Sequence, residues 1–163
     1  MMARLPNVKF MQALLLAVAV AACSAPPPPG MALGQELFET CSPCHGDTGV
    51  GDPDIDAPAI AGLPQWYVED QLRSFQAGFR GKHADDLAGL RMRAMAVSLN
   101  RDGDIASVAE YIASLTAPIP ESTLHGNAGA GAAAYTTSCV ACHGVDGLGN
   151  EALHAPPIVY LDH

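Results

Sequence analysis

A five-residue motif, Cys-x-x-Cys-His, occurs twice in this chain and constrains its fold more than any other feature. The copies lie 98 residues apart, and their reactive residues are Cys41, Cys44, His45, Cys139, Cys142 and His143. Two thiols followed directly by an imidazole are the attachment signature of c-type haem. We therefore predict two covalently bound haem c groups, each held by thioether bonds and by its histidine as proximal iron ligand.

Two other uses of a cysteine pair explain the motifs less well. A redox dithiol usually lies between a strand and a helix of an α/β pattern, which this sequence lacks. A structural zinc site would need its four ligands to converge from two separate knuckles, and it predicts a colourless protein. Neither use explains why a histidine follows directly in both copies.

The chain is acidic, with a formal net charge of −9 at pH 7. An excess of carboxylates on the surface repels nucleic acid, so no nucleic-acid partner is expected. We predict instead redox partner proteins that present basic docking patches.

The N-terminal residues 1–22 have the pattern of a secretory signal peptide. Arg4 and Lys9 precede an apolar run from Phe10 to Ala22, which is too short to read as a membrane-spanning helix. The run ends at Cys23, the fifth cysteine, and residues 20–23 resemble the lipobox of bacterial lipoproteins. The resemblance implies that Cys23 carries lipid on the periplasmic side of a bacterial membrane. Ordinary cleavage with Cys23 as a spare thiol, and an uncleaved anchor, are the alternatives.

Residues 23–30 contain four consecutive prolines and are predicted to form a polyproline tether between the lipid anchor and the first domain. The tether would hold the domain away from the bilayer, because such a segment has no packed core of its own.

Apolar periodicity predicts three helices within residues 31–116. They cover about 31–44, about 65–77 and the stretch from Ile105 to Leu115, with Asn100 or Asp102 as N-cap of the last. An apolar stripe on and after the second helix is predicted to form core and pocket wall; it comprises Trp66, Val68, Leu72, Phe75 and Phe79. A glycine inside a helix costs about 1 kcal/mol relative to alanine, so Gly34 predicts close approach by another helix.

The small apolar segment 57–63, together with the first motif, resembles class I cytochromes c. It is similar in particular to two-domain diheme bacterial carriers and to cytochrome c domains fused to bacterial oxidase subunits. The resemblance implies that the carbonyl of Pro58 accepts a hydrogen bond from Nδ1 of His45, although Pro58 could be a plain loop proline. It also implies a methionine as distal ligand, on a loop before the last helix. Met92 is favoured and Met95 is the competitor.

The family resemblance also implies that Tyr111 meets the N-terminal helix near Gly34. Arg80 and His83 are candidate partners of the haem propionates, or simply solvated side chains.

Residues 117–130 lack periodicity and are predicted to be a linker, whereas residues 131–163 repeat the first unit. In this repeat Pro156 takes the place of Pro58, and His163 takes the place of Gln65. The expected fold is therefore all-α, with one complete class I cytochrome c domain (31–116) followed by a truncated second copy (131–163). No methionine follows Met95, so the second haem has no evident distal ligand.

Three interpretations of the second copy stay open. The sequence could be a fragment of a longer diheme cytochrome, another chain could complete the half-domain, or the second haem could be open to small ligands. The resemblance implies an electron carrier between membrane-bound redox partners of a bacterial respiratory chain, not an enzyme. The alternative is a haem enzyme or ligand-binding subunit, peroxidase-like or the electron-entry subunit of a dehydrogenase.

Overall fold

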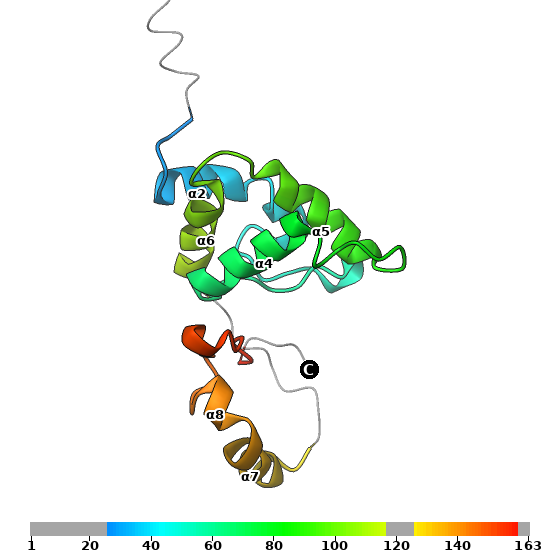
Figure 1. The fold of residues 1–163 in the computed structure, drawn as a ribbon, viewed down its shortest axis with the longest axis vertical. Coiled ribbons are helices and arrows are strands. Elements are labelled where there is room, and N and C mark those ends of the chain that lie inside the picture. The colour runs from blue at the N-terminus through cyan, green and yellow to red at the C-terminus, as the bar shows by residue number, and fades with distance from the viewer. Residues whose placement is uncertain (1–25, 117–125, 160–163) are drawn as a thin grey trace, which may run out of the picture.

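The computed structural model describes residues 26–116 and 126–159, and within them the regular structure is helical (Figure 1). The helices are α2 (Met31–Phe38), α3 (Ser42–His45), α4 (Gln65–Ala77), α5 (Leu87–Ser98), α6 (Asp104–Ser114), α7 (Ala128–Ser138) and α8 (Val140–His143). Two 3₁₀ turns, η1 (Pro53–Ile55) and η2 (Glu151–Leu153), complete the set. The predicted all-α class is confirmed, while the predicted signal peptide and Cys23 lie outside the described residues.

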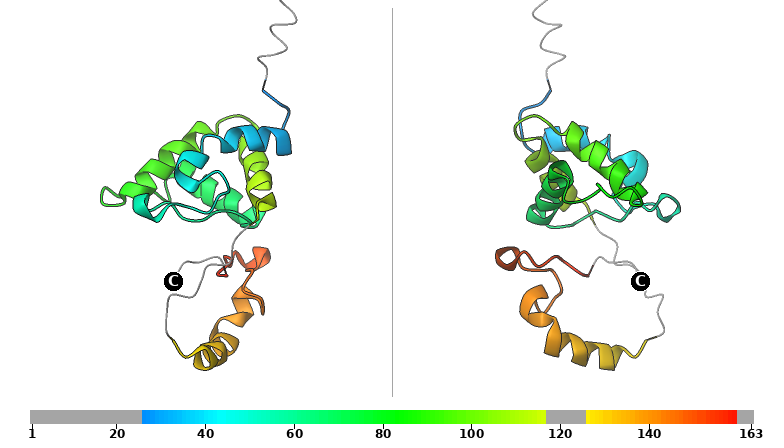
Figure 2. Two further views of the ribbon diagram at one scale, coloured as in Figure 1. Left: turned by 180° about the vertical axis from the view of Figure 1, so that it is seen from behind. Right: turned by 45° about the vertical axis from the view of Figure 1, so that its right-hand side comes forward.

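Helices α2 and α6 cross at Gly34, as the sequence predicted (Figure 2). A Cβ atom at Gly34 would overlap the carbonyl oxygen of Ser107 and would lie 2.9 Å from the Cβ of Tyr111. Beside the crossing, the rings of Phe38 and Tyr111 pack with their centroids 5.3 Å apart. The glycine therefore serves close helix packing, which offsets its cost within α2.

Helix α4 has the predicted bounds and ends at Gly78, whose φ of 77° places it in the left-handed region. Val68, Leu72 and Phe75 are buried in the core with residues of α2, α5 and α6. The prediction for Phe79 is wrong, because this side chain is 87% exposed. Phe79 follows the left-handed turn at Gly78, so it no longer continues the helical stripe.

The predicted helix over 31–44 is interrupted after Phe38, and the chain turns before α3 begins at Ser42. After Phe38 the backbone bonds shorten to i→i−3, from Thr40 N–H to the Leu37 carbonyl and from Cys41 N–H to the Phe38 carbonyl. Pro43 then lies in the first turn of α3, where its missing N–H leaves no helical bond unmade.

The predicted N-cap of α6 is also wrong, because Gly103 holds that position. The buried carboxylate of Asp104 instead accepts a hydrogen bond from the backbone N–H of Arg101, at 3.0 Å, and pairs with the Arg101 guanidinium at 3.1 Å.

Helix α7 begins at Ala128, inside the predicted linker 117–130. The Asn127 side chain caps it by accepting a hydrogen bond from the N–H of Ala130, at 3.0 Å. Periodicity missed the start of α7 because none of its residues is buried. The high helix propensity of its alanines and the N-cap at Asn127 determine where this helix begins.

The predicted tether is attached to the domain at its C-terminal end. The N–H of Gly30 donates to the buried Ser107 hydroxyl at 2.9 Å, and a Cβ atom at Gly103 would lie 2.8 Å from the Pro29 ring. The direction in which the chain enters α2 is therefore set by contacts with α6 and its N-cap. Across residues 26–116 and 126–159, no helix is long and apolar enough to cross a membrane.

Candidate functional site

The first motif is built on α3 and the residue before it. Cys41 is half-buried, Cys44 is exposed, and His45 ends the helix with only 7% of its surface exposed. Residues three apart lie on the same side of a helix, so both thiols can reach one flat group. Neither cysteine forms a disulfide.

Burial raises the pKa of the Cys41 thiol to about 11, and the nearby Cys44 thiol adds to the effect. A free thiol at this position therefore stays protonated at neutral pH.

The imidazole of His45 is oriented by the backbone of the following loop. Its Nδ1 lies 2.8 Å from the carbonyl oxygen of Pro58, as predicted. Because the carbonyl can only accept, Nδ1 carries the proton and Nε2 keeps a free lone pair. An imidazole in this tautomer is a preorganised metal ligand.

A glycine at position 51 allows the loop that carries Pro58 to come this close to His45. The N–H of Gly51 donates to the His45 carbonyl at 2.8 Å, and Gly51 has a φ of 83°. A Cβ atom at Gly51 would lie 2.6 Å from the Ala57 carbonyl oxygen and from the Ala59 nitrogen. Sequence reasoning gave Gly51 no role, although a glycine six residues after the histidine in both motifs was the available signal.

The second motif repeats this arrangement. Nδ1 of His143 lies 2.8 Å from the Pro156 carbonyl oxygen, and the N–H of Gly149 donates to the His143 carbonyl at 3.0 Å. Gly149 has a φ of 84°, and a Cβ atom there would lie 2.5 Å from the Ala155 carbonyl oxygen. Both copies therefore present one histidine with its Nδ1 already bound and two cysteine thiols beside it.

This donor set fits haem attachment. Each motif offers two uncrosslinked thiols and one imidazole with Nε2 free, which are the groups that thioether formation and proximal ligation use. A zinc site is not assembled, since among residues 26–116 and 126–159 no three His, Cys, Asp or Glu side chains gather as metal ligands. Haem is thus the group that these residues could hold.

Both candidate distal ligands lie on helix α5, so the prediction that they occupy a loop is wrong. The Asp86 side chain caps this helix by accepting a hydrogen bond from the Gly89 N–H at 2.7 Å, which draws the segment into helix. Met92 is half-buried against the core, whereas Met95 is 43% exposed. Burial favours Met92, and its role as ligand stays a prediction.

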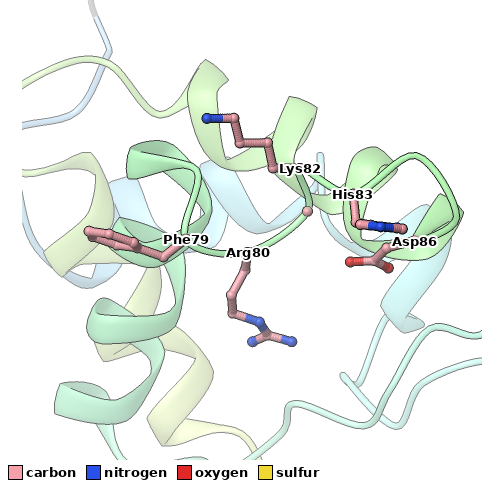
Figure 3. Close-up of a pocket in the computed structure, with 6 residues that line it drawn as sticks. Phe79, Arg80, Lys82, His83 and Asp86 are labelled. Carbon is pink, nitrogen blue, oxygen red and sulfur yellow. The ribbon is translucent and has the colours of Figure 1, made fainter.

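A shallow open pocket lies at the loop between α4 and α5, lined by Phe79, Arg80, Gly81, Lys82, His83 and Asp86 (Figure 3). Figure 3 shows the Arg80 and Lys82 side chains pointing away from each other, so they do not form one convergent anion site. The Arg80 guanidinium stacks 4.4 Å from the centre of the Phe75 ring. His83 is exposed and lies 3.7 Å from the Asp85 carboxylate. The propionate contacts predicted for Arg80 and His83 stay predictions.

Comparison with known proteins gives one family match, to the model described as "Cytochrome c", over residues 31–116. The chain is 30% identical over 135 residues to the cbb3-type cytochrome c oxidase subunit FixP of Bradyrhizobium diazoefficiens, covering 77% of this chain and 43% of that protein. It is 32% identical over 124 residues to a thiosulfate dehydrogenase electron acceptor of Thiomonas intermedia, covering 68% of this chain and 52% of that protein. The chain thus spans about half the length of these relatives.

Among solved structures, reduced recombinant cytochrome c4 from Pseudomonas stutzeri is similar, with a TM-score of 0.58 and 25% sequence identity. The similarity covers 80% of this chain and 72% of that one. The share of this chain that it covers is larger than the segment 31–116 matched by the family model.

Proposed function

The chain belongs to the cytochrome c family and carries covalently bound haem c, and from this membership we propose that it transfers electrons between redox proteins of a bacterial respiratory chain. The observation that carries the proposal is the repeated bond from histidine Nδ1 to a proline carbonyl, 2.8 Å in both units. It holds each imidazole in the orientation and tautomer that an iron ligand needs.

The haem iron supplies one-electron chemistry, and the protein's residues determine how it is held. Cys41 and Cys44 would attach the first group, with His45 proximal and Met92 distal. Cys139, Cys142 and His143 would hold the second. Ligation by the Met92 thioether together with the His45 imidazole would stabilise ferrous iron and raise the reduction potential, as suits delivery of electrons to an oxidase.

The distal ligand is tested by one pair of variants in the haem-loaded chain. Met92→Ala should abolish the ferric thioether-to-iron charge-transfer band, while Met95→Ala, on the same helix, should retain it. The reverse result would assign the ligand to Met95. A band that survives in both variants would show that neither methionine is the sole ligand, and a band already absent from the unaltered chain would contradict methionine ligation.

A second candidate function, a haem enzyme or ligand-binding subunit, is favoured by the sparse surroundings of the second motif. None of the residues of α7 or α8 is buried. Carbon monoxide or cyanide binding at the second haem, with peroxide turnover, would support this function. Inertness to all three would support the carrier.

The partners follow from charge and from the relatives. An acidic chain of net charge −9 would dock on basic patches of a membrane oxidase or a dehydrogenase, the classes that its relatives' names contain. The rate of electron transfer to such a partner should fall steeply as ionic strength rises. A rate independent of salt would contradict electrostatic docking.

We place the chain on the periplasmic side of the membrane, held by lipid on Cys23. The support is the sequence of residues 1–23 alone. Cys23→Ser should abolish lipid labelling and release the protein from the membrane fraction. Membrane recovery with unchanged labelling would contradict lipidation.

A further inference from the structure

We propose that Gln76 is a positioning residue for the distal side of the first haem. Its side-chain amide ties the last turn of α4 to the C-terminal end of α5, the helix that carries Met92. The inference rests on the proposed role of Met92 as axial ligand.

The amide of Gln76 uses both of its hydrogens on α5 and the residue that follows it. Nε2 donates to the Ala96 carbonyl at 2.9 Å and to the Leu99 carbonyl at 2.8 Å. The last carbonyls of a helix have no partner within the helix, and here they lie at a partly buried contact between α4 and α5. One side chain therefore donates to two acceptors at this end of α5, of which the Ala96 carbonyl also accepts from the Leu99 N–H at 3.2 Å.

This attachment lies one turn from Met92. Ala96 follows Met92 by four residues, so the two share a face of α5, and Ala96 is fully buried in the core while Met92 packs against it. Any shift of the Ala96 backbone moves Met92 along the same axis. By holding Ala96, Gln76 fixes how far α5 can slide or rotate.

The other end of α5 is held independently. Asp86 caps it through the Gly89 N–H, and a Cβ atom at Gly81 would overlap the Gly89 carbonyl oxygen, so the incoming loop fits closely there. At the C-terminal end of α5, Ala96 and Leu99 are buried in the core, and the two hydrogen bonds from Gln76 add a directional restraint to this packing. Met92 therefore lies between two restrained ends of the helix.

A purely structural role and a positioning role for Gln76 predict different experimental results. The bond between iron and a thioether sulfur is weak, so its occupancy depends on preorganisation of the methionine as well as on global stability. Loss of positioning should let an added ligand displace Met92 more easily while the protein remains folded.

The test uses the haem-loaded chain and imidazole as the displacing ligand. The readout is the imidazole concentration that halves the thioether-to-iron band, which reports on the first haem alone if no methionine binds the second. Gln76→Leu removes both donors and leaves an apolar side chain that is one atom shorter. We expect half-loss at about tenfold lower imidazole, as the loss of two hydrogen bonds permits.

The matched control is Gln65→Leu, on the same helix. The Gln65 amide donates only to Glu69 of α4, at 3.0 Å, and does not reach α5. This variant should bind imidazole as the unaltered chain does. Gln76→Glu serves if Gln76→Leu does not fold, since an ionised carboxylate of the same shape cannot donate to the two carbonyls.

Two outcomes overturn different claims. Equal imidazole responses in the Gln76 and Gln65 variants, with the band lost in Met92→Ala, would overturn the positioning role and leave the ligand assignment intact. A band that survives in Met92→Ala would overturn the ligand assignment itself.

Discussion

Residues 41–58 and residues 139–156 follow the same backbone path around their histidines. Gly51 and Gly149 have φ values of 83° and 84°, and Asp56 and His154 occupy the left-handed region at matching positions. Even the isolated bridges correspond, from Asp52 to Ala57 and from Asn150 to Ala155. Each motif therefore builds its own proximal loop.

The surroundings of the two loops differ. His45 is 7% exposed, while His143 is only half-buried. Three residues of α2 are buried, and none of α7 is. The orientation of the histidine is thus a local property that both loops share, whereas its burial differs between the two units.

The largest expected contrast comes from removing each proximal ligand. His45→Ala should destabilise the first unit by about 3 kcal/mol, because it empties a buried site. His143→Ala should alter only the spectrum of the second haem, since little packs around it. Denaturant unfolding followed by circular dichroism measures the difference, and equal losses would refute the contrast.

A second contrast compares Gly34 with Gly131, an open position on α7 where an added Cβ atom would have no neighbour within 4 Å. Gly34→Ala should cost about 3 kcal/mol because the new methyl group overlaps α6. Gly131→Ala should stabilise α7 by about 1 kcal/mol through helix propensity. Hydrogen exchange across both helices would check this, and protection of α7 lost in Gly131→Ala would show that the helix has a close partner.

The similarity of the two loops is tested by Gly51→Ala and Gly149→Ala. Each adds about 2 kcal/mol of backbone strain at a positive φ and pushes away the carbonyl that holds the histidine. A less basic imidazole stabilises ferric iron less, so both potentials should rise on the order of tens of millivolts. Redox titration of the two haems would show similar shifts, and a shift at one haem alone would mean that the loops are not equivalent.

The smallest effects are expected at the helix caps. Asp86→Ala and Asn127→Ala should each cost about 1 kcal/mol of local helix stability. Only the Asp86 variant should also make Met92 easier to displace with imidazole, because Asp86 caps the helix that carries it. Easier displacement in the Asn127 variant would link α7 to the first haem.

Much of the site could be predicted from sequence because it depends on short-range chemistry. The motif residues, the Pro58 and Pro156 carbonyls and the bounds of α4 all follow from spacing or from family resemblance. The exposure of Phe79 and the helical setting of Met92 could not be predicted. Both depend on where the chain turns after Gly78 and on how the loop at 78–86 packs against α5.

The sequence by itself determined the two haem-attachment motifs, the helical class and the need for close packing at Gly34, because each depends on residue types at fixed spacing. Only the tertiary structure decided that α6 receives Gly34 through Ser107, that Met92 is more buried than Met95, and that Gln76 holds the end of α5. These contacts join segments 20 or more residues apart. Their partners are chosen by packing of the whole core, which local patterns of residues do not specify.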